Sequence, residues 1–346
     1  MAGPGLTTEQ MQEAIDAYYQ NGEVQVDAAN ALGLPKSTFE NRLKRAKQAG
    51  FRPGVAEVEF PEFPDNCPDA EAFLDLQEKR FDKEEKYRQA VNWFRIKVKH
   101  SDPIAINWFG DPHLGSNGCN VKRLREDIET IKETPGMYAA NIGDTIDGWS
   151  DRMARLYADN DVSRATEWQL AKWFLEEKGI PWILWLFGNH DNMHSGFTSY
   201  LKAIKAASIP MLDWQAKFIV EFKNGQEFKF DCAHNHKGHS WFHELHGQLR
   251  AAMDSGYQAD IYMAGHHHNW ALLEREGPQG QPVLYARCRG YKFHDSYSDH
   301  HGFYEHQAGC SIVTVLDPAA KSPIERIRGF KSTSEGAEYL TWLRSR

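Results

Sequence analysis

The stretch IYMAGHHHNW, residues 261–270, joins a short apolar run to three consecutive histidines through a single glycine. A short apolar run bounded by a turn signal is typical of a buried strand. Imidazole is the commonest metal ligand in proteins, so a strand that ends in histidines could deliver ligands to a metal ion. A polar loop without a function is the other interpretation. The choice between them depends on the partners that the rest of the chain supplies.

Four other apolar runs end in the same kind of polar cluster. INWFGDPHLG carries Asp111 and His113, AANIGDTIDG carries Asp144 and Asp147, LWLFGNHDN carries Asn189, His190 and Asp191, and KFDCAHNHKGHS carries His234 and His236. Polar residues at a single strand end are often only turn formers. Five clusters that converge on one sheet edge would be costly unless they bind something. Carboxylate and imidazole together suit Mn²⁺, Fe or Zn²⁺, so we predict a metal centre.

The spacing within two of these clusters indicates how the ligands divide. On an extended segment, residues i and i+2 point to the same side. Asp111 with His113, and His266 with His268, are therefore each expected to share a metal, while His267 points elsewhere. Glycines at positions 110, 143, 188 and 265 are expected to permit the tight turns that aim the ligands inward.

The arrangement of apolar runs predicts the architecture of the larger part of the chain. From about residue 95, short apolar runs alternate with helical stretches, which predicts an α/β domain over 95–330 whose sheets are covered by helices. Residues 51–66 contain three prolines and a run of acids, so 51–94 is interpreted as a linker followed by a connecting helix. Residues 331–346 are expected to form a tail with a last amphipathic helix.

Residues 1–50 have the outline of three short helices in a helix-turn-helix arrangement. Asp27 is expected to cap the second helix, and Ser37 with Glu40 has the spacing of a capping box for the third. The third helix carries the basic residues Arg42, Lys44, Arg45 and Lys47. Basic charge on one element is what a groove-reading helix requires, so DNA binding is predicted. The alternative is an assembly module with a solvated basic face.

Composition limits the class of protein. The net charge of −8, from 40 basic and 48 acidic residues, argues against a uniformly basic nucleic-acid coat but permits a local basic patch. No apolar run reaches the roughly 18–20 residues of a membrane span, and the N-terminus lacks the features of a signal peptide. The five cysteines, Cys67, Cys119, Cys232, Cys288 and Cys310, are not closely paired. Reduced thiols and a cytoplasmic location, in a bacterium or a phage-infected host, are therefore expected.

The order Asp-x-His, Gly-Asp-x-x-Asp, Gly-Asn-His-Asp, His and Gly-His-x-His resembles the calcineurin-like metallophosphoesterase superfamily over roughly residues 95–320. The resemblance implies a four-layered αββα sandwich with two divalent metal ions, Mn²⁺ being favoured over Fe or Zn²⁺. It implies that Asp111, His113 and His268 bind one metal, that Asn189, His234 and His266 bind the other, and that Asp144 bridges them. It further implies that His190 is a proton donor or transition-state stabiliser, oriented by Asp191. His236 stays open as an alternative to His234.

The activity that follows from this resemblance is hydrolysis of phosphodiester bonds by a metal-activated hydroxide. A helix-turn-helix module ahead of such a domain looks like phage-encoded proteins and favours nucleic acid as the substrate, as for a DNA nuclease. One alternative is a phosphomonoesterase or small-nucleotide phosphodiesterase whose helical module serves assembly. A DNA-binding protein with an inert phosphoesterase domain is a third reading, against which the full ligand set argues. The sequence fixes neither the natural substrate nor the oligomeric state.

Overall fold

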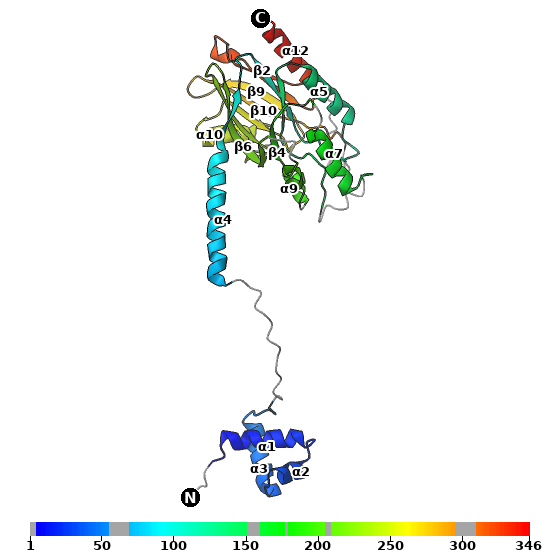
Figure 1. The fold of residues 1–346 in the computed structure, drawn as a ribbon, viewed down its shortest axis with the longest axis vertical. Coiled ribbons are helices and arrows are strands. Elements are labelled where there is room, and N and C mark those ends of the chain that lie inside the picture. The colour runs from blue at the N-terminus through cyan, green and yellow to red at the C-terminus, as the bar shows by residue number, and fades with distance from the viewer. Residues whose placement is uncertain are drawn as a thin grey trace. The chain divides into compact units, whose positions relative to one another are not determined.

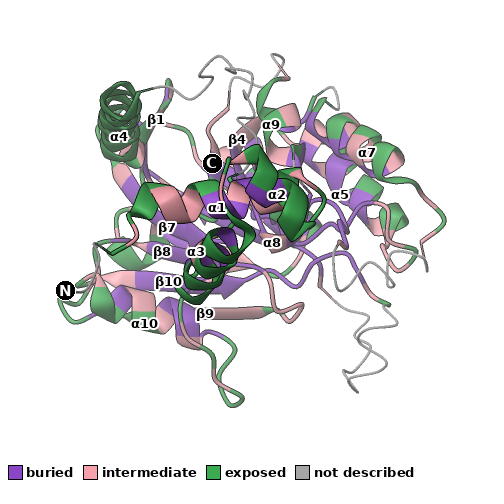
Figure 2. Cartoon of the chain, turned by 90° about the horizontal axis from the view of Figure 1, so that it is seen from below, coloured by how far each residue is buried: buried purple, intermediate pink, exposed green. Residues whose placement is uncertain are grey.

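The computed structural model describes residues 5–54, 69–150, 160–176, 179–194, 196–204, 209–294 and 309–346 of the chain. It contains two compact units, Met1–Leu76 and Gln77–Arg346 (Figure 1). Residues 55–66 of the predicted linker, and Cys67, lie outside the described residues. Helix α4 (Ala70–Val91) occupies the place of the predicted connecting helix. None of its residues is buried, so it is green in Figure 2.

The N-terminal unit is a small all-α unit. Helices α1 (Thr8–Gln20), α2 (Gln25–Ala31) and α3 (Lys36–Gln48) pack around an apolar core that includes Ile15, Phe39 and Leu43. Apolar residues at helical spacing thus form one shared core, as the pattern predicts.

Both helix caps that we predicted in this unit are wrong. Asp27 lies inside α2, which begins after Val24. Its carboxylate is therefore in the first turn, where a negative charge interacts favourably with the positive end of the helix dipole. Pro35 is the N-cap of α3, and its fixed φ leads the chain into the helix early enough to place Ser37 inside the first turn. A capping box does exist in this unit, at α1, where Thr7 and Gln10 exchange hydrogen bonds of 3.1 and 3.2 Å.

The second unit contains two six-stranded sheets. Sheet I has the order β1-β6-β7-β8-β10-β9, from strands Asn92–Val98, Gln215–Phe222, Glu227–Ala233, Ile261–Ala264, Pro282–Arg287 and Ala271–Glu276. Sheet II has the order β12-β11-β2-β3-β4-β5, from strands Ile327–Phe330, Ile312–Leu316, Ile104–Phe109, Met137–Asn141, Trp182–Phe187 and Met211–Asp213. Strands β2, β3, β4 and β5 run parallel in sheet II, and β7, β8 and β10 run parallel in sheet I.

Helices cover the outer face of each sheet. Helices α5 (Val121–Glu133), α7 (Arg164–Glu176) and α12 (Thr333–Arg344) share an apolar core with sheet II. Helix α10 (His246–Asp254) packs against β8 and β10 of sheet I. A third core lies between the sheets. The chain therefore has the predicted four-layered αββα sandwich, and the segment expected as a C-terminal tail contributes α12 to an outer layer.

Strand β2 is buried on both of its faces. Ile104, Ile106 and Trp108 point into the core between the sheets, whereas Ala105 and Phe109 face the helices. Side chains of a strand alternate between its faces, so a central strand of a sandwich is apolar at nearly every position. The one polar residue of β2, Asn107, is buried as well, and its Oδ1 accepts a hydrogen bond of 2.8 Å from the hydroxyl of Thr333. Figure 2 shows similar burial along β8 and β10.

No helix in the described ranges combines the length and the apolar character that a membrane crossing needs. The described cysteines, Cys119, Cys232, Cys288 and Cys310, are free thiols, as the sequence predicts.

Candidate metal centre

The predicted ligands all follow the carboxyl ends of parallel strands. Asp111 and His113 follow β2, Asp144 follows β3, Asn189 and His190 open helix α8 (Asn189–Met193) after β4, His234 follows β7, and His266 and His268 follow β8. The carboxyl ends of neighbouring parallel strands meet at one edge of a sheet. The loops of both sheets therefore bring these eight residues together. Seven of them form three overlapping clusters, and the eighth, Asn189, lies beside His234.

The backbone at the ligands is not extended, so the spacing argument made from the sequence is wrong in its premise. Asp111, His113, Asp144, His266 and His268 have φ between 42° and 73°, in the left-handed region. L-residues adopt this region at a cost, and such residues collect at functional sites. One consequence is that His266 and His268 belong to different clusters, whereas Asp111 and His113 share one.

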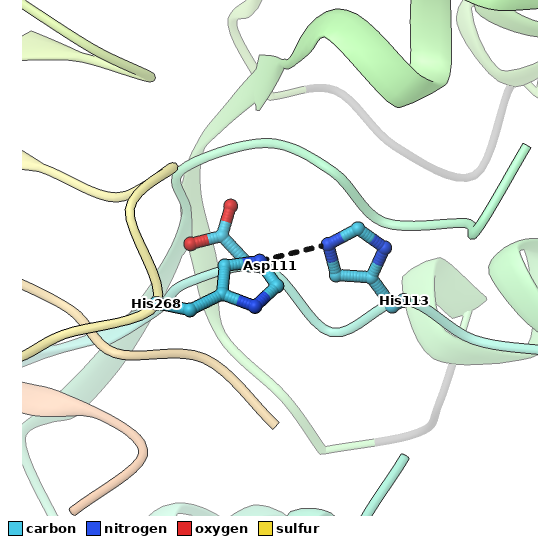
Figure 3. A group of neighbouring side chains, drawn as sticks. All are labelled: Asp111, His113 and His268. Atoms are coloured by element: carbon cyan, nitrogen blue, oxygen red, sulfur yellow. Dashed lines mark hydrogen bonds between the residues drawn. The ribbon is translucent and has the colours of Figure 1, made fainter. Parts of the chain in front are cut away.

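The first cluster contains Asp111, His113 and His268 (Figure 3). The Nε2 atoms of the two histidines lie 3.1 Å apart, as the dashed line in Figure 3 marks. One carboxylate oxygen of Asp111, Oδ2, accepts a hydrogen bond from the backbone N–H of His266. The other oxygen, Oδ1, is buried without a hydrogen-bond partner among the described residues. A buried carboxylate with an orphaned oxygen, beside two imidazoles, fits a cation.

The second cluster contains Asp144, His234 and His266. Nε2 of His234 lies 3.1 Å from Oδ2 of Asp144, 3.0 Å from Oδ1 of Asn189 and 3.1 Å from Nδ1 of His266. His236 is not near these atoms, because its Nε2 lies 3.2 Å from the carboxylate of Asp231. The structure therefore places His234, and not His236, at the centre.

Asp144 links the two clusters. Its carboxylate also belongs to a group with His113 and His190, and its Oδ2 lies 3.9 Å from Nε2 of His113. This is the position that a bridging carboxylate needs. Gly188 keeps the position open, since a Cβ atom there would lie 2.1 Å from Oδ1 of Asp144. Gly143 has a φ of +109° and makes the turn before Asp144, as predicted, whereas the other three glycines, Gly110, Gly188 and Gly265, do not have a positive φ.

Hydrogen bonds at the far side of two rings fix where their lone pairs point. Nδ1 of His234 faces the carbonyl oxygen of Ile142 at 3.0 Å, and a carbonyl can only accept. The proton of the neutral ring is therefore on Nδ1, and the Nε2 lone pair faces the oxygens of Asp144 and Asn189. Likewise Nδ1 of His113 donates to Oδ1 of Asp147 at 3.0 Å. Acceptors that converge on one point repel each other unless a cation lies between them.

The pKa values of the four histidines indicate neutral ligands at His113, His266 and His268, and a preference for positive charge at His234. Burial lowers the pKa of His113 and of His266 to about 4, and that of His268 well below its usual range. These rings are neutral at pH 7 and can act as ligands. Burial alone would lower the pKa of His234, but the charge and hydrogen bond of Asp144, the charge of Asp111 and the carbonyl of Ile142 together outweigh it and raise the pKa to about 9. A bound cation supplies that positive charge as well as a proton does, so the residues fit divalent metals.

A buried support behind His113 was not predicted from the sequence. Oδ1 of Asp147 accepts from His113 and, at 2.7 Å, from the ammonium of Lys292, which is also buried. Burial acts to raise the pKa of Asp147, but the hydrogen bond from His113 and the charge of Lys292 hold it below its usual range. Carboxylates in this position orient a ligating imidazole and increase its basicity. Nothing in the spacing around Lys292 marks it in the sequence.

His190 is held by a different group from the one predicted. Its Nδ1 hydrogen bonds to the backbone carbonyl of Asp147. The carboxylate of Asp191 instead accepts three backbone N–H groups, from Thr145, Ile146 and Gly188. Asp191 therefore joins the loops after β3 and β4, and it acts on His190 through the backbone.

The four basic residues predicted to bind DNA lie in the N-terminal unit. Lys44, Arg45 and Lys47 are exposed on α3, and Lys47 lies over the ring of Tyr18 at 4.1 Å. Arg42 is half-buried, so its guanidinium is less available to a ligand than the other three cations.

Comparisons with known proteins give fold-level matches only. No protein-family model matches the chain. No curated protein matches it either. Among solved structures, Vps29 from Entamoeba histolytica complexed with zinc matches with a TM-score of 0.32 and 10% identity, covering 66% of this chain and 98% of that chain. A predicted phosphoesterase from Streptococcus pneumoniae matches with a TM-score of 0.29 and 13% identity, covering 66% and 98%. The precursor of a 5'-nucleotidase from Thermus thermophilus matches with a TM-score of 0.32 and 9% identity, covering 70% and 58%. Scores at this level do not extend the activity of any of these proteins to this chain.

Proposed function

We propose that this protein is a dinuclear-metal phosphoesterase that hydrolyses phosphodiester bonds in nucleic acid. The observation that carries the proposal is the pair of buried Asp/His clusters that share Asp144. Asp111, His113 and His268 would hold one metal, Asn189, His234 and His266 the other, with Asp144 between them. Oxygen and imidazole ligands of this kind suit Mn²⁺ first, with Fe or Zn²⁺ as the other candidates. When bound, two such cations polarise phosphoryl oxygens and activate a water molecule as the nucleophile.

The chain's own residues supply the remaining chemistry. Asp147 and Lys292 fix the ring of His113, so that its Nε2 lone pair stays directed at the centre. The Nδ1 proton of His190 is held by the carbonyl of Asp147, which leaves Nε2 as the atom that takes up and releases a proton. In this position Nε2 of His190 can protonate an alkoxide leaving group.

Nucleic acid is proposed as the substrate because of α3. Its apolar residues Phe39, Leu43 and Ala46 are buried in the N-terminal unit, which leaves Lys44, Arg45 and Lys47 exposed. A cationic helix face binds phosphates, and its affinity falls steeply with salt. A DNA strand bound through this face would be a natural substrate for a phosphodiesterase centre in the same chain.

Hydrolysis of a substrate panel tests the activity. With Mn²⁺ added, the full chain should cleave single-stranded or duplex DNA, and Asp144→Asn should not, which excludes a contaminating nuclease. Hydrolysis of cyclic nucleotides or p-nitrophenyl phosphate without DNA cleavage would favour the small-substrate phosphoesterase instead. A wild-type protein that neither retains metal nor hydrolyses any ester would be a DNA-binding protein with an inert domain.

Charge reversal tests the role of α3. The double variant Lys44→Glu/Arg45→Glu should weaken duplex binding and reduce the slope of log K against log salt by about 2, because each phosphate contact contributes about 0.9. The matched control is Lys79→Glu/Arg80→Glu on α4, which makes the same change of charge at exposed helical positions. Equal slopes for both variants and the wild type would leave α3 as an assembly element.

A further inference from the structure

Two large aromatic side chains are exposed to solvent on one loop of sheet I. The loop 235–245, NHKGHSWFHEL, joins β7 to α10, and at its tip Trp241 is 85% and Phe242 97% exposed. By comparison, the other tryptophans with exposed side chains in the described ranges, Trp214, Trp270 and Trp342, reach 39–44%. Leaving such a side chain in water forgoes roughly 1.5–3 kcal/mol of burial. A neighbouring pair at a loop tip therefore points to a ligand that covers it.

The loop has internal order despite this exposure. The backbone N–H of Phe242 donates to Oγ of Ser240 at 3.2 Å, and that of Leu245 donates to Nδ1 of His243 at 3.2 Å. Leu245 is buried against sheet I and ends the loop in the core. The two aromatic side chains are thus presented by a structured turn.

A buried arginine ties this loop to the metal ligands. Arg287, at the end of β10, donates from Nε to the carbonyl of Glu244 at 3.0 Å and from Nη1 to Oδ1 of Asn235 at 3.5 Å. Nη1 also donates to the carbonyl of Gly265, the residue before the ligand His266. One guanidinium therefore holds both ends of the loop and the start of the ligand loop. The position of the loop relative to the metal centre is fixed by these bonds.

A series of edge-on and tilted ring contacts connects His266 to the loop tip. The rings of His266 and His267 lie 4.9 Å apart, those of His267 and His239 5.3 Å, and those of His239 and Trp241 5.7 Å. Trp214 lies next to the second metal cluster and the start of the loop. Its ring is 5.2 Å from the ring of His234, and its Nε1 donates to the carbonyl of Asn235. The aromatic tip is continuous with the second metal cluster.

We propose that Trp241 and Phe242 form a stacking platform for unpaired nucleobases next to the phosphate that the centre hydrolyses. The proposal rests on the proposed function in taking nucleic acid as the substrate, and it narrows the substrate to strands with unpaired bases. Bases inside a duplex are already stacked on each other, so only unpaired bases can cover these rings. Every base has a π-face, which makes such a platform tolerant of sequence. The loop carries one lysine, Lys237, one acid, Glu244, and imidazoles, so it does not repel a phosphate backbone.

Binding measured without metal separates the platform from catalysis. An oligothymidylate and an abasic strand of the same length are titrated calorimetrically into the full chain in EDTA. Base stacking contributes about 1–3 kcal/mol per base, which is about 5- to 150-fold in affinity. The wild type should bind the oligothymidylate more tightly than the abasic strand by a factor in that range. Contacts to the backbone, including those of α3, are common to both probes and cancel.

Three variants complete the test. Trp241→Ala/Phe242→Ala removes both aromatic rings from the loop and should lose the preference for bases. Trp241→Phe/Phe242→Tyr keeps an aromatic ring at each position and should therefore keep the preference. Trp342→Ala on α12 is the control for removal of an exposed tryptophan and should bind as the wild type does. Equal binding of the two probes by the wild type, or an unchanged preference in the alanine double variant, overturns the proposal.

Two further readouts separate the alternatives. If sedimentation shows that the alanine double variant dissociates a dimer while its base preference is unchanged, the aromatic tip is a self-association surface and the proposal is overturned. Cleavage of the oligothymidylate by the wild type with Mn²⁺ tests the proposed function on its own. Base-dependent binding without cleavage supports the platform and refutes the nuclease, whereas cleavage with base-independent binding refutes the platform alone.

Discussion

Glu167, on α7, carries a buried carboxyl group whose ionisation should destabilise the folded protein. It is fully buried, and its only hydrogen bond given by the described residues is a long one of 3.4 Å from the N–H of Gly148 to Oε1. Its other oxygen, Oε2, has no partner there. Burial, with a further contribution from the charge of Asp147, raises the pKa of Glu167 from 4.5 to about 8.

The sign of the effect follows from proton binding. Between pH 4.5 and about 8 the folded protein holds a proton on Glu167 that the unfolded chain releases, so stability falls as the pH rises through this window. At about 1.4 kcal/mol per pH unit, the loss is roughly 5 kcal/mol at pH 9 and under about 1 kcal/mol at pH 5. Glu167→Gln keeps the shape and cannot ionise. It should therefore raise the melting temperature by about 10 °C at pH 9 and by about 2 °C or less at pH 5.

Thermal unfolding of the full chain in EDTA, at one scan rate and at pH 5, 7 and 9, measures this difference. Glu176→Gln is the matched control, because Glu176 lies on the same helix but is exposed, and it should shift the melting temperature little at any pH. An equal rise at pH 5 and pH 9 for Glu167→Gln would mean that the substitution acts through packing. No rise at pH 9 would show that the buried carboxyl group is not protonated in the folded protein.

Three further predictions concern the metal centre. His266→Ala should lower the metal content measured by mass spectrometry, whereas His267→Ala should leave it nearly unchanged; equal losses would refute the ligand assignment. His190→Ala should lower kcat by about 10²–10⁴-fold with an alkoxide leaving group and far less with p-nitrophenolate, and equal losses would assign His190 to binding. Asp147→Asn should weaken metal binding about 10–100-fold, because it removes the charged acceptor for His113; an unchanged Kd in a calorimetric titration would contradict this.

The α/β domain and a metal centre at its strand ends could be predicted because the chemistry restricts the residue types, whereas the four layers and the division of the ligands between two metals were implied by the family resemblance. A strand buried on both faces needs a nearly continuous apolar run, as in β2, where Asn107 is the one polar residue, and a metal needs carboxylate and imidazole at the strand ends. These two requirements leave a pattern in the sequence at Asp111, Asp144 and His266. The structure brings those residues together because parallel strands end at the same edge.

The groups that hold the ligands could not be predicted, because ordinary sequence surrounds them. Arg287 ends the strand VLYAR and Lys292 follows shortly after it, and neither spacing indicates a buried charge. Their partners include backbone carbonyls, side-chain amides and one carboxylate from segments distant in the sequence, which only the fold brings together. The rule that residues i and i+2 share a side failed at His266 and His268 for a related reason. It assumes extended backbone, and these residues adopt left-handed φ values that the sequence does not reveal.

The left-handed backbone of the ligand residues also indicates which contacts hold the metal centre together. Each such residue costs of order 1–3 kcal/mol and persists only where the surrounding structure determines it. Here the determining contacts are within the protein: Asp191 binds three backbone N–H groups of the loops after β3 and β4, Asp111 binds the N–H of His266, and Arg287 binds the carbonyl of Gly265. The strain at the ligands is therefore offset by the sandwich itself. A metal ion can supply the folding free energy of a small zinc-dependent domain, whereas here hydrogen bonds of the protein hold the strained ligand residues.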